Sequence, residues 1–401
     1  MANIVIILSY ILFVFFVYKL VKSNNLLVLL PVYYLFTVTY VLTGVFYLDY
    51  AKDTPFNMYE LVSEKAILKS SYYYILASLS FYLGCSLFKQ NKIETFLSRS
   101  RQLDIPYQKL IVFICFLTFI IFVSSYGFEP LLHREGYISQ YHDRNKIGLI
   151  VFYIIAPISF VLIPFLRRRI TKYIVYTILF MMLMSSSSRF LVMLPFLYIV
   201  GSYLRYGYFK LFTSLFHLMI VVFGLIFILQ IRYYTYQGLI PNINSFFSKG
   251  IDPDYLFTGL NYAFSFSLMG TAYVIENIPF DFNGFLIGIN PMPSRYLNIS
   301  YMLQVQEMLP TAPISAISLL SQSGVVLTSL FYFLSAYIFS FIFSRMKGET
   351  LLYYVVAGLF IIFMLFSIQY NIRGLTRFLY ISIFIFLMHK FVFKYKFVFR
   401  R

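Results

Sequence analysis

Long apolar runs separated by short polar segments dominate the pattern of hydrophobic and polar positions along this chain. A helix needs roughly 20 apolar residues to cross the hydrocarbon of a bilayer, and a backbone in lipid must satisfy its polar groups internally. We therefore interpret about eleven of these runs as membrane-spanning helices. The predicted spans are Asn3–Tyr18, Leu26–Leu48, Tyr72–Phe88, Leu110–Ser124, Leu149–Leu166, Tyr173–Met184, Phe190–Leu204, Leu211–Ile231, Gly324–Phe343, Leu351–Ile368 and Phe378–Phe393.

The composition predicts the same fold class, an all-α polytopic membrane protein. Hydrophobic residues make up 60% of the 401 positions and charged residues only 12%, which excludes a water-soluble globule. The formal net charge of +17 then reflects membrane topology, and no nucleic-acid partner is predicted. Cys85 and Cys115 lie inside apolar runs, where we expect small buried residues. No metal site and no cofactor are predicted.

The basic residues between the runs predict the orientation of the chain. If Lys19 and Lys22 are cytoplasmic and the sides alternate, the cytoplasmic segments hold well over half of the 32 basic residues. The outer segments, residues 49–71, 125–147 and 232–323, are neutral or net negative. The sequence thus predicts a single membrane domain over residues 1–401, with the N-terminus outside and the basic C-terminal tail against cytoplasmic headgroups.

The outer segments carry features of their own. Asn57–Lys69 begins like a capping box and predicts a helix that lies on the outer face. The segment 232–323 is far longer than an ordinary connection, and loops of such length are usually functional. Within it, residues 259–275 are apolar enough for a re-entrant helix, alongside other short helices. A hidden pair of full spans there would leave the predicted orientation unchanged.

Seven arginines fall on the predicted outer side, against the general bias of basic residues toward the cytoplasm. Arginine presents a planar fork of donors that suits phosphate oxygens, and it stays charged at every working pH. Each residue alone could be an interfacial anchor, but several together predict an anionic ligand. They are Arg134, Arg144, Arg189, Arg232, Arg295, Arg373 and Arg377.

Three of these arginines have informative neighbours. Arg189 follows four serines between two apolar runs, so it is either a snorkelling residue in a tight hairpin or part of a site at the membrane boundary. The serines themselves could cap helix ends or hydrogen-bond a ligand, and capping is the favoured interpretation. Arg373 and Arg377 are four residues apart and would share one face of a helix.

Candidates for a general base lie in the same outer segments. His142 could carry a proton near neutral pH, although a solvated loop histidine is the competing interpretation. Asp254 belongs to an Asp-Pro-Asp pattern similar to metal-holding acid pairs of some glycosyltransferases, but the pattern also suits a turn with a helix cap. Glu307 is the third candidate.

Several local motifs follow one another in an order that resembles a known family. A serine-rich hairpin ends in Arg189, and the long outer segment carries a Pro-x-Pro-x-Arg element that ends in Arg295. An Ala-Pro-Ile-Ser stretch occupies residues 312–315, and a late Arg373 precedes a glycine. This arrangement, which covers most of the chain, resembles the Wzy-type polymerases of bacterial oligosaccharide repeat units.

The resemblance implies an enzyme of the bacterial inner membrane that joins undecaprenyl-diphosphate-linked oligosaccharides into O-antigen or a related surface polysaccharide. Besides the lipid bilayer, a chain-length regulator and a flippase are implied as partners. We expect the diphosphates to be held by arginine side chains and one of His142, Asp254 and Glu307 to act as the base. The expected arginines are Arg134, Arg189, Arg232, Arg295, Arg373 and Arg377.

Other function classes remain open at this stage. Related O-antigen ligases are described with a functional histidine in the large outer loop, and no histidine occurs between Arg232 and Ser323, which favours a polymerase. A flippase or other transporter of lipid-linked oligosaccharides predicts charges deep within spans and two repeated halves, neither of which is evident. A scaffold without chemistry would leave the outer arginines unexplained.

Overall fold

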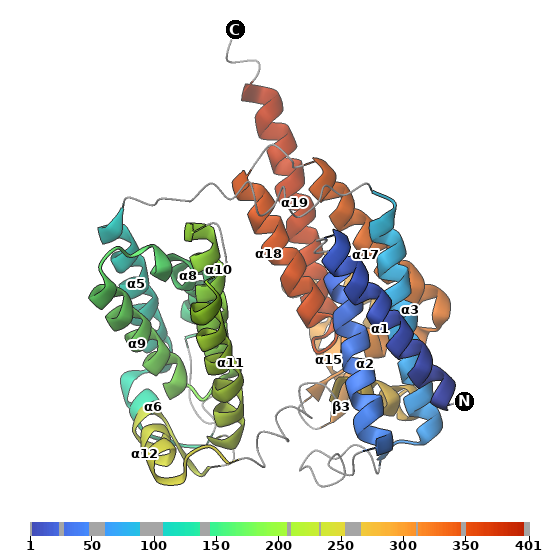
Figure 1. Ribbon diagram of the computed structural model, residues 1–401, viewed down its shortest axis with the longest axis horizontal. Coiled ribbons are helices and arrows are strands. Elements are labelled where there is room, and N and C mark those ends of the chain that lie inside the picture. The colour runs from blue at the N-terminus through green and yellow to red at the C-terminus, as the bar shows by residue number, and fades with distance from the viewer. Residues whose placement is uncertain are drawn as a thin grey trace. The chain divides into compact units, whose positions relative to one another are not determined.

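The structure, a computed structural model, describes residues 2–23, 28–47, 61–88, 107–136, 145–206, 210–231, 234–252, 266–309, 312–345 and 350–396. Regular structure in these ranges is helical apart from two two-stranded antiparallel sheets (Figure 1). Six of the described helices are long and apolar enough to cross a membrane, so the all-α membrane class is confirmed at this level. They contain Asn3–Lys22, Gln108–Tyr126, Ile147–Phe165, Leu211–Ile231, Val325–Arg345 and Ile372–Phe391.

Each of the eleven predicted spans coincides with a helix. Two of them include a short 3₁₀ turn, at the end of α8 and at the start of α10. The number of helices that span a membrane and their orientation stay predictions. The helices are α1 (Ala2–Ser23), α2 (Leu29–Tyr47), α3 (Glu64–Ser86), α5 (Gln108–Tyr126), α8 (Lys146–Leu162) with η4 (Ile163–Phe165), α9 (Arg169–Ser185), η5 (Arg189–Val192) with α10 (Met193–Tyr206), α11 (Leu211–Ile231), α17 (Val325–Arg345), α18 (Thr350–Phe366) and α19 (Ile372–Lys396).

The helix predicted over Asn57–Lys69 is replaced, from Glu64 onward, by the first turns of α3. Residues 57–60 of the predicted helix lie outside the described residues. The N-cap is Ser63, whose hydroxyl accepts the backbone N–H of Ala66 at 3.2 Å. Ser63 also donates its own backbone N–H to the carboxylate of Glu276 at 3.0 Å. This second contact is tertiary, so the sequence around Asn57 could not predict where the helix begins.

The chain forms two compact units, and each is described by itself. The first comprises Met1–Ile93 with Leu260–Arg401, and the second is Glu94–Gly259. The prediction of a single membrane domain over residues 1–401 stays a prediction.

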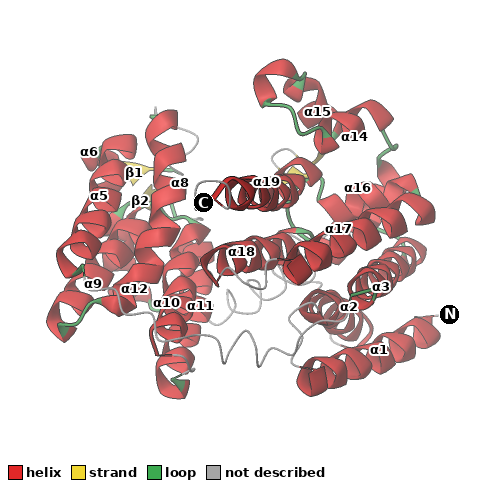
Figure 2. Cartoon of the chain, turned by 90° about the horizontal axis from the view of Figure 1, so that it is seen from above, coloured by secondary structure: helices red, strands yellow, loops and turns green. Residues whose placement is uncertain are grey.

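In the first unit, α3 and α17 pack side by side at very short range (Figure 2). A Cβ atom built on Gly84 of α3 would lie 2.4 Å from the carbonyl oxygen of Phe333 and 2.9 Å from the Cβ of Ala336. The two backbones can approach this closely because Gly84 has no side chain. α2 packs against α3, and α18 packs against α19.

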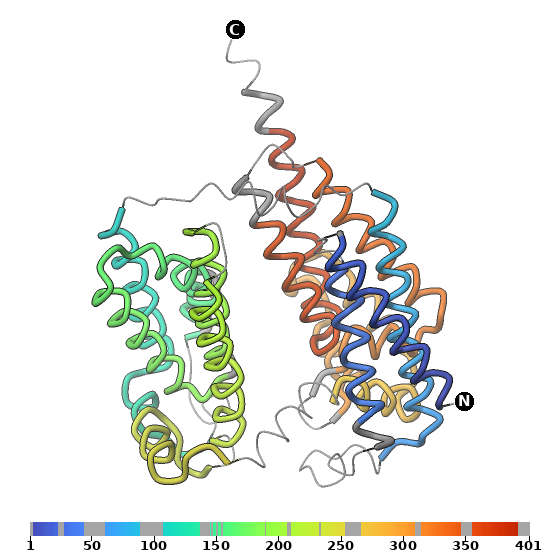
Figure 3. The backbone as a smooth tube through the Cα atoms, viewed as in Figure 1, coloured from blue at the N-terminus to red at the C-terminus, as the bar shows by residue number. Residues whose placement is uncertain are grey.

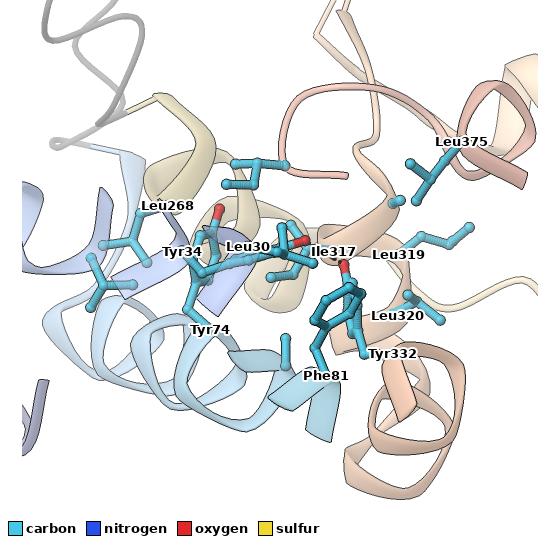
Figure 4. Close-up of a cluster of buried hydrophobic side chains, with 14 of the residues drawn as sticks. Leu30, Tyr34, Tyr74, Phe81, Leu268, Ile317, Leu319, Leu320, Tyr332 and Leu375 are labelled. Atoms are coloured by element: carbon cyan, nitrogen blue, oxygen red, sulfur yellow. Dashed lines mark hydrogen bonds between the residues drawn. The ribbon is translucent and has the colours of Figure 1, made fainter. Parts of the chain in front are cut away.

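A group of buried tyrosines lies in the core of the first unit (Figure 4). The hydroxyl of Tyr34 on α2 is hydrogen-bonded to the hydroxyls of Tyr332 on α17, at 2.9 Å, and of Ser367 beyond α18, at 2.6 Å. The rings of Tyr34 and Tyr74 meet edge to face with centroids 5.5 Å apart. Buried hydroxyls require partners, so this contact fixes three helices in one register.

Short elements fill the long segment that precedes α17. Residues 266–277 form a helix whose Leu268 and Ala272 are completely buried in the core, so the described part of the predicted re-entrant segment 259–275 packs on protein. Residues 253–265 lie outside the described residues. The elements that follow are α14 (Phe282–Ile289), η6 (Ser294–Tyr296), α15 (Ile299–Val305), β3 (Glu307–Leu309) paired with β4 (Ala312–Pro313), and α16 (Ala316–Ser323).

The second unit is a bundle of α5, α8, α9, α10 and α11 (Figure 3). α5 packs against α8, α8 against α10, and α10 against α11. One end of the bundle carries α6 (Phe128–Leu132), α12 (Leu239–Lys249) and a small sheet in which β1 (Arg134–Glu135) pairs with β2 (Tyr236–Gln237). α12 lies against α9.

We predict that Gly84→Ala lowers the free energy of unfolding by about 1–3 kcal/mol, because the new methyl group meets backbone that cannot move without separating α3 from α17. Gly358→Ala is the control, since nothing lies within 4 Å of a Cβ atom built on Gly358 of α18. That variant should be neutral or more stable by about 0.4–1 kcal/mol. Thermal unfolding in detergent measures both, and equal stability of the two variants would contradict the close packing.

Candidate functional site

Arg373, in the first turn of α19, ties this helix to the end of α14. Its side chain is buried. Nη1 donates to the carbonyl oxygens of Ile287 (3.0 Å) and Asn290 (3.2 Å), and Nη2 donates to the carbonyl of Met292 (2.9 Å). These carbonyls lie at or just beyond the C-terminus of a helix, where backbone acceptors lack partners and a positive charge is favourable. Arg373 is therefore a positioning residue in this structure.

Arg377 lies one turn further along α19 and is exposed. Its Nη2 donates to the hydroxyl of Ser294 at 3.2 Å, and Arg373 donates to the same oxygen at 3.3 Å. Arg295, which follows Ser294 in the chain, is also exposed. Its guanidinium carbon lies 4.6 Å from the ring centroid of Tyr296. Two of the predicted arginines, Arg373 and Arg377, thus share the hydroxyl of Ser294, and a third, Arg295, follows Ser294 in the chain. Sequence analysis did not single out Ser294.

The segment that carries Arg295 is held by further contacts. Asp281 caps α14 and accepts a hydrogen bond from the hydroxyl of Tyr301 at 2.8 Å, which raises the pKa of Tyr301. The hydroxyl of Tyr380 donates to the carbonyl of Ile289. A Cβ atom on Gly288 would lie 2.6 Å from Cγ2 of Ile372, so α14 sits directly on the start of α19. Arg295 and Arg377 therefore project from a fixed backbone.

The predicted base Glu307 lies on β3 of the same unit and is exposed. Its neighbour Gln306 is 2% exposed, and neither its amide nitrogen nor its amide oxygen has a hydrogen-bond partner among the described residues. The amide nitrogen of Gln306 lies close to the backbone of α14, 3.4 Å from the position that a Cβ atom would occupy on Gly284. An unpaired buried amide is costly and commonly marks a place where a water or ligand binds. No pattern in the sequence distinguishes Gln306 from other glutamines.

Arg134 has a similar structural role in the second unit. It is 3% exposed, and its Nη1 donates to the carbonyls of Ser185 (2.7 Å) and Pro130 (2.9 Å). Nη2 donates to the hydroxyl of Ser187 at 3.2 Å. Its acceptors include the C-terminus of α9, so Arg134 compensates the end of that helix.

The serine turn after α9 is shaped by these contacts. Ser187 has a φ of 53°, the one positive φ among the described non-glycine residues, and also accepts a hydrogen bond from Nδ2 of Asn242 at 3.2 Å. Ser188 caps η5 by accepting the backbone N–H of Phe190, so the capping prediction is confirmed for this one serine. Arg189 is the first residue of η5, at the positive end of the helix that continues as α10.

The remaining predicted site residues lie outside the described residues. They are Arg144, Arg232, His142 and Asp254. Among the predicted residues whose side chains are described, the structure joins Arg373 and Arg377 through Ser294, the neighbour of Arg295, in the first unit and places Arg134 in the second.

Chemically, the first unit offers the exposed Arg377 near the N-terminus of α19 and the exposed Arg295 next to the serine that Arg377 contacts. Backbone N–H groups and the helix dipole favour an anion there, and arginine forks favour phosphate oxygens. No group of three or more His, Cys, Asp or Glu side chains that could hold a metal ion occurs among the described residues. No protein-family model, curated protein or solved structure matches this chain.

We predict that Arg134→Gln lowers the free energy of unfolding by at least about 1.5–3 kcal/mol, because it removes charged donors from buried carbonyl groups. The matched control is Glu135→Gln, at the exposed neighbouring position of the same strand, which should change stability by less than about 0.5 kcal/mol. Chemical unfolding of both variants in detergent measures the difference. Equal effects would contradict the capping role.

Proposed function

We propose that this protein is a polymerase of the outer face of the bacterial inner membrane, which joins undecaprenyl-diphosphate-linked oligosaccharide units into a surface polysaccharide. Two lines support this proposal. The resemblance to Wzy-type polymerases rests on the motifs around Arg189, Arg295 and Arg373, and the helical membrane architecture fits a lipid-linked substrate.

The observation that carries the proposal is the contact of Arg377 with the hydroxyl of Ser294, the residue that precedes Arg295 in the chain. Both guanidinium groups are exposed, whereas Arg373 beside them is buried and uses Nη1 and Nη2 on protein acceptors. We therefore assign diphosphate binding in the first unit to Arg295 and Arg377. Arg373 keeps their backbone in place.

The proposed reaction is a glycosyl transfer between two lipid-linked chains. A sugar hydroxyl of one unit attacks the anomeric carbon of the other, forming a new C–O bond. The bond from that carbon to the diphosphate oxygen breaks, and polyprenyl diphosphate leaves with the electron pair. The hydroxyl proton passes to a carboxylate, for which Glu307 is the described candidate.

Positive charge fixed beside the leaving group would lower the barrier of this reaction. Negative charge builds on the bridging oxygen as the glycosidic bond breaks, and preorganised donors at that oxygen are worth about 10²–10³ in rate. Arg295 and Arg377 would supply such donors without a metal ion. Because their backbone is held by α14 and α19, little reorganisation would be needed.

We predict that Arg295→Ala and Arg377→Ala each reduce polymer formation about 100-fold or more, because each removes charge that stabilises the leaving diphosphate. Lysine at either position should restore only part of the activity, since it lacks the planar fork. The matched control is Arg345→Ala at the end of α17, another exposed arginine, whose guanidinium lies 5.5 Å from the ring of Phe341. Chain length of surface glycan on a gel measures the effect in a host that lacks the native gene.

The same host distinguishes the alternative functions. Loss of polymer with a single repeat unit retained on the lipid core supports a polymerase, whereas loss of every repeat unit indicates a ligase or a flippase. Long chains of normal amount in both alanine variants would refute the assigned arginines.

A further inference from the structure

Four basic residues meet at the end of the second unit that is remote from its small sheet. Lys172 lies in the first turn of α9, with Arg169 on the same turn, Arg205 near the end of α10 and Lys210 just before α11. Lys172, Arg205 and Lys210 are half-buried, and Arg169 is exposed. This set, called the basic cluster below, is separate from the residues of the proposed glycosyl transfer.

Contacts within the bundle hold two members of the basic cluster in place. Nη1 of Arg205 donates to the carbonyls of Pro164 and Leu166, the latter at 2.9 Å. The ammonium of Lys210 lies 3.4 Å from the ring centroid of Tyr206, and the guanidinium carbon of Arg205 lies 5.1 Å from the same centroid. One aromatic ring therefore brings two cations together.

Burial and the neighbouring cations change the pKa of Lys172. Burial, together with the positive charges of Arg205, Lys210 and Arg169, lowers the pKa of Lys172 to about 8. Within the described residues, the charged groups that act on Lys172 are cations of α9 itself, of α10 and of the residue before α11. Like charges at short range are unfavourable unless an anion joins them.

Within the described part of the second unit, the carboxylates lie at the opposite end. Glu129 and Glu135 belong to α6 and β1, whose neighbour Arg134 binds the C-terminus of α9, about 24 Å along the helix axis from the basic cluster. The backbone N–H of Asp252 is bound to Gln230, in the last turn of α11. The basic cluster therefore has no described carboxylate within reach.

Large apolar side chains surround the basic cluster. Ile170 and Tyr173 on α9 are 75% and 67% exposed, and Leu211 and Phe212 on α11 are 66% and 87% exposed. Exposed apolar residues beside half-buried cations are the pattern of a membrane interface, where hydrocarbon meets charged headgroups. A free phosphate ion would make no use of these side chains, whereas acyl chains would cover them.

We propose that the basic cluster binds the phosphate group of an anionic phospholipid, with Lys172 and Lys210 as direct ligands and the acyl chains along α9 and α11. This site is independent of the proposed polymerase activity.

The test is a lipid titration of the full-length protein in detergent, followed by native mass spectrometry. Phosphatidylglycerol should bind wild type more tightly than phosphatidylcholine does. The double variant Lys172→Gln with Lys210→Gln should bind phosphatidylglycerol about thirtyfold more weakly. Each cation removed near a membrane surface lowers the affinity by a factor of about five or slightly more, and the two factors multiply. Without lipid, this variant should be no less stable to heat, because it removes unfavourable repulsion.

The matched control is Lys249→Gln. Lys249 also lies over a tyrosine ring, 4.4 Å from the centroid of Tyr234, but at the opposite end of the bundle. It should keep the wild-type affinity. Equal loss in the control and the double variant, or equal binding of both lipids to wild type, would overturn the site. Tight binding of inorganic phosphate without preference for phosphatidylglycerol would overturn the assignment to a lipid.

The pH dependence provides a second test of Lys172. With a pKa near 8, Lys172 is charged below that pH and neutral above it, so phosphatidylglycerol affinity should fall between pH 7 and 9. Lys172→Arg keeps its charge over this range and should bind equally at both values. A fall of the same size in the arginine variant would exclude Lys172 as a ligand.

Discussion

The carbonyl groups at the ends of helices impose the main constraint on this fold, because they have no backbone partners and little water is available to them. Among the described residues, three arginines donate hydrogen bonds to such carbonyl groups. Arg134 binds the end of α9, Arg373 binds the end of α14, and Arg205 binds the carbonyls that follow α8. Each of these contacts joins segments far apart in the sequence, so the same side chains that satisfy helix ends also set the tertiary arrangement.

This structural use of arginine separates residues that look alike in the sequence. Arg373 and Arg377 differ by one turn of α19, yet the first is buried among carbonyl groups and the second is exposed. The buried residue holds the segment after α14 in place, and the exposed one is the residue proposed to bind an anion. In the second unit, Arg205 likewise binds backbone carbonyl groups, whereas Lys172 and Lys210 beside it are the residues proposed to bind lipid phosphate.

The helices could be predicted almost completely from the sequence, because hydrophobic length alone specifies a helix in lipid; α11 was predicted to the residue. The start of α3 could not, since it depends on the contact between Ser63 and Glu276, more than 200 positions apart. For the candidate site, the spacing of four residues predicted that Arg373 and Arg377 share a helix face. The sequence could not show that Ser294 joins them. Nor could it show that Arg134 and Arg373 are buried, because their burial depends on which helix ends lie nearby. Four predicted residues, His142, Arg144, Arg232 and Asp254, lie outside the described ranges.

The shared hydroxyl of Ser294 has a consequence for the energetics of recognition. Arg373 also donates to Ser294, so under the proposed function Arg377 would exchange this hydroxyl for an anion without releasing the segment that carries Ser294. Occupied and empty forms would then have the same main chain, and the entropy lost on association would be confined to one or two side-chain rotamers.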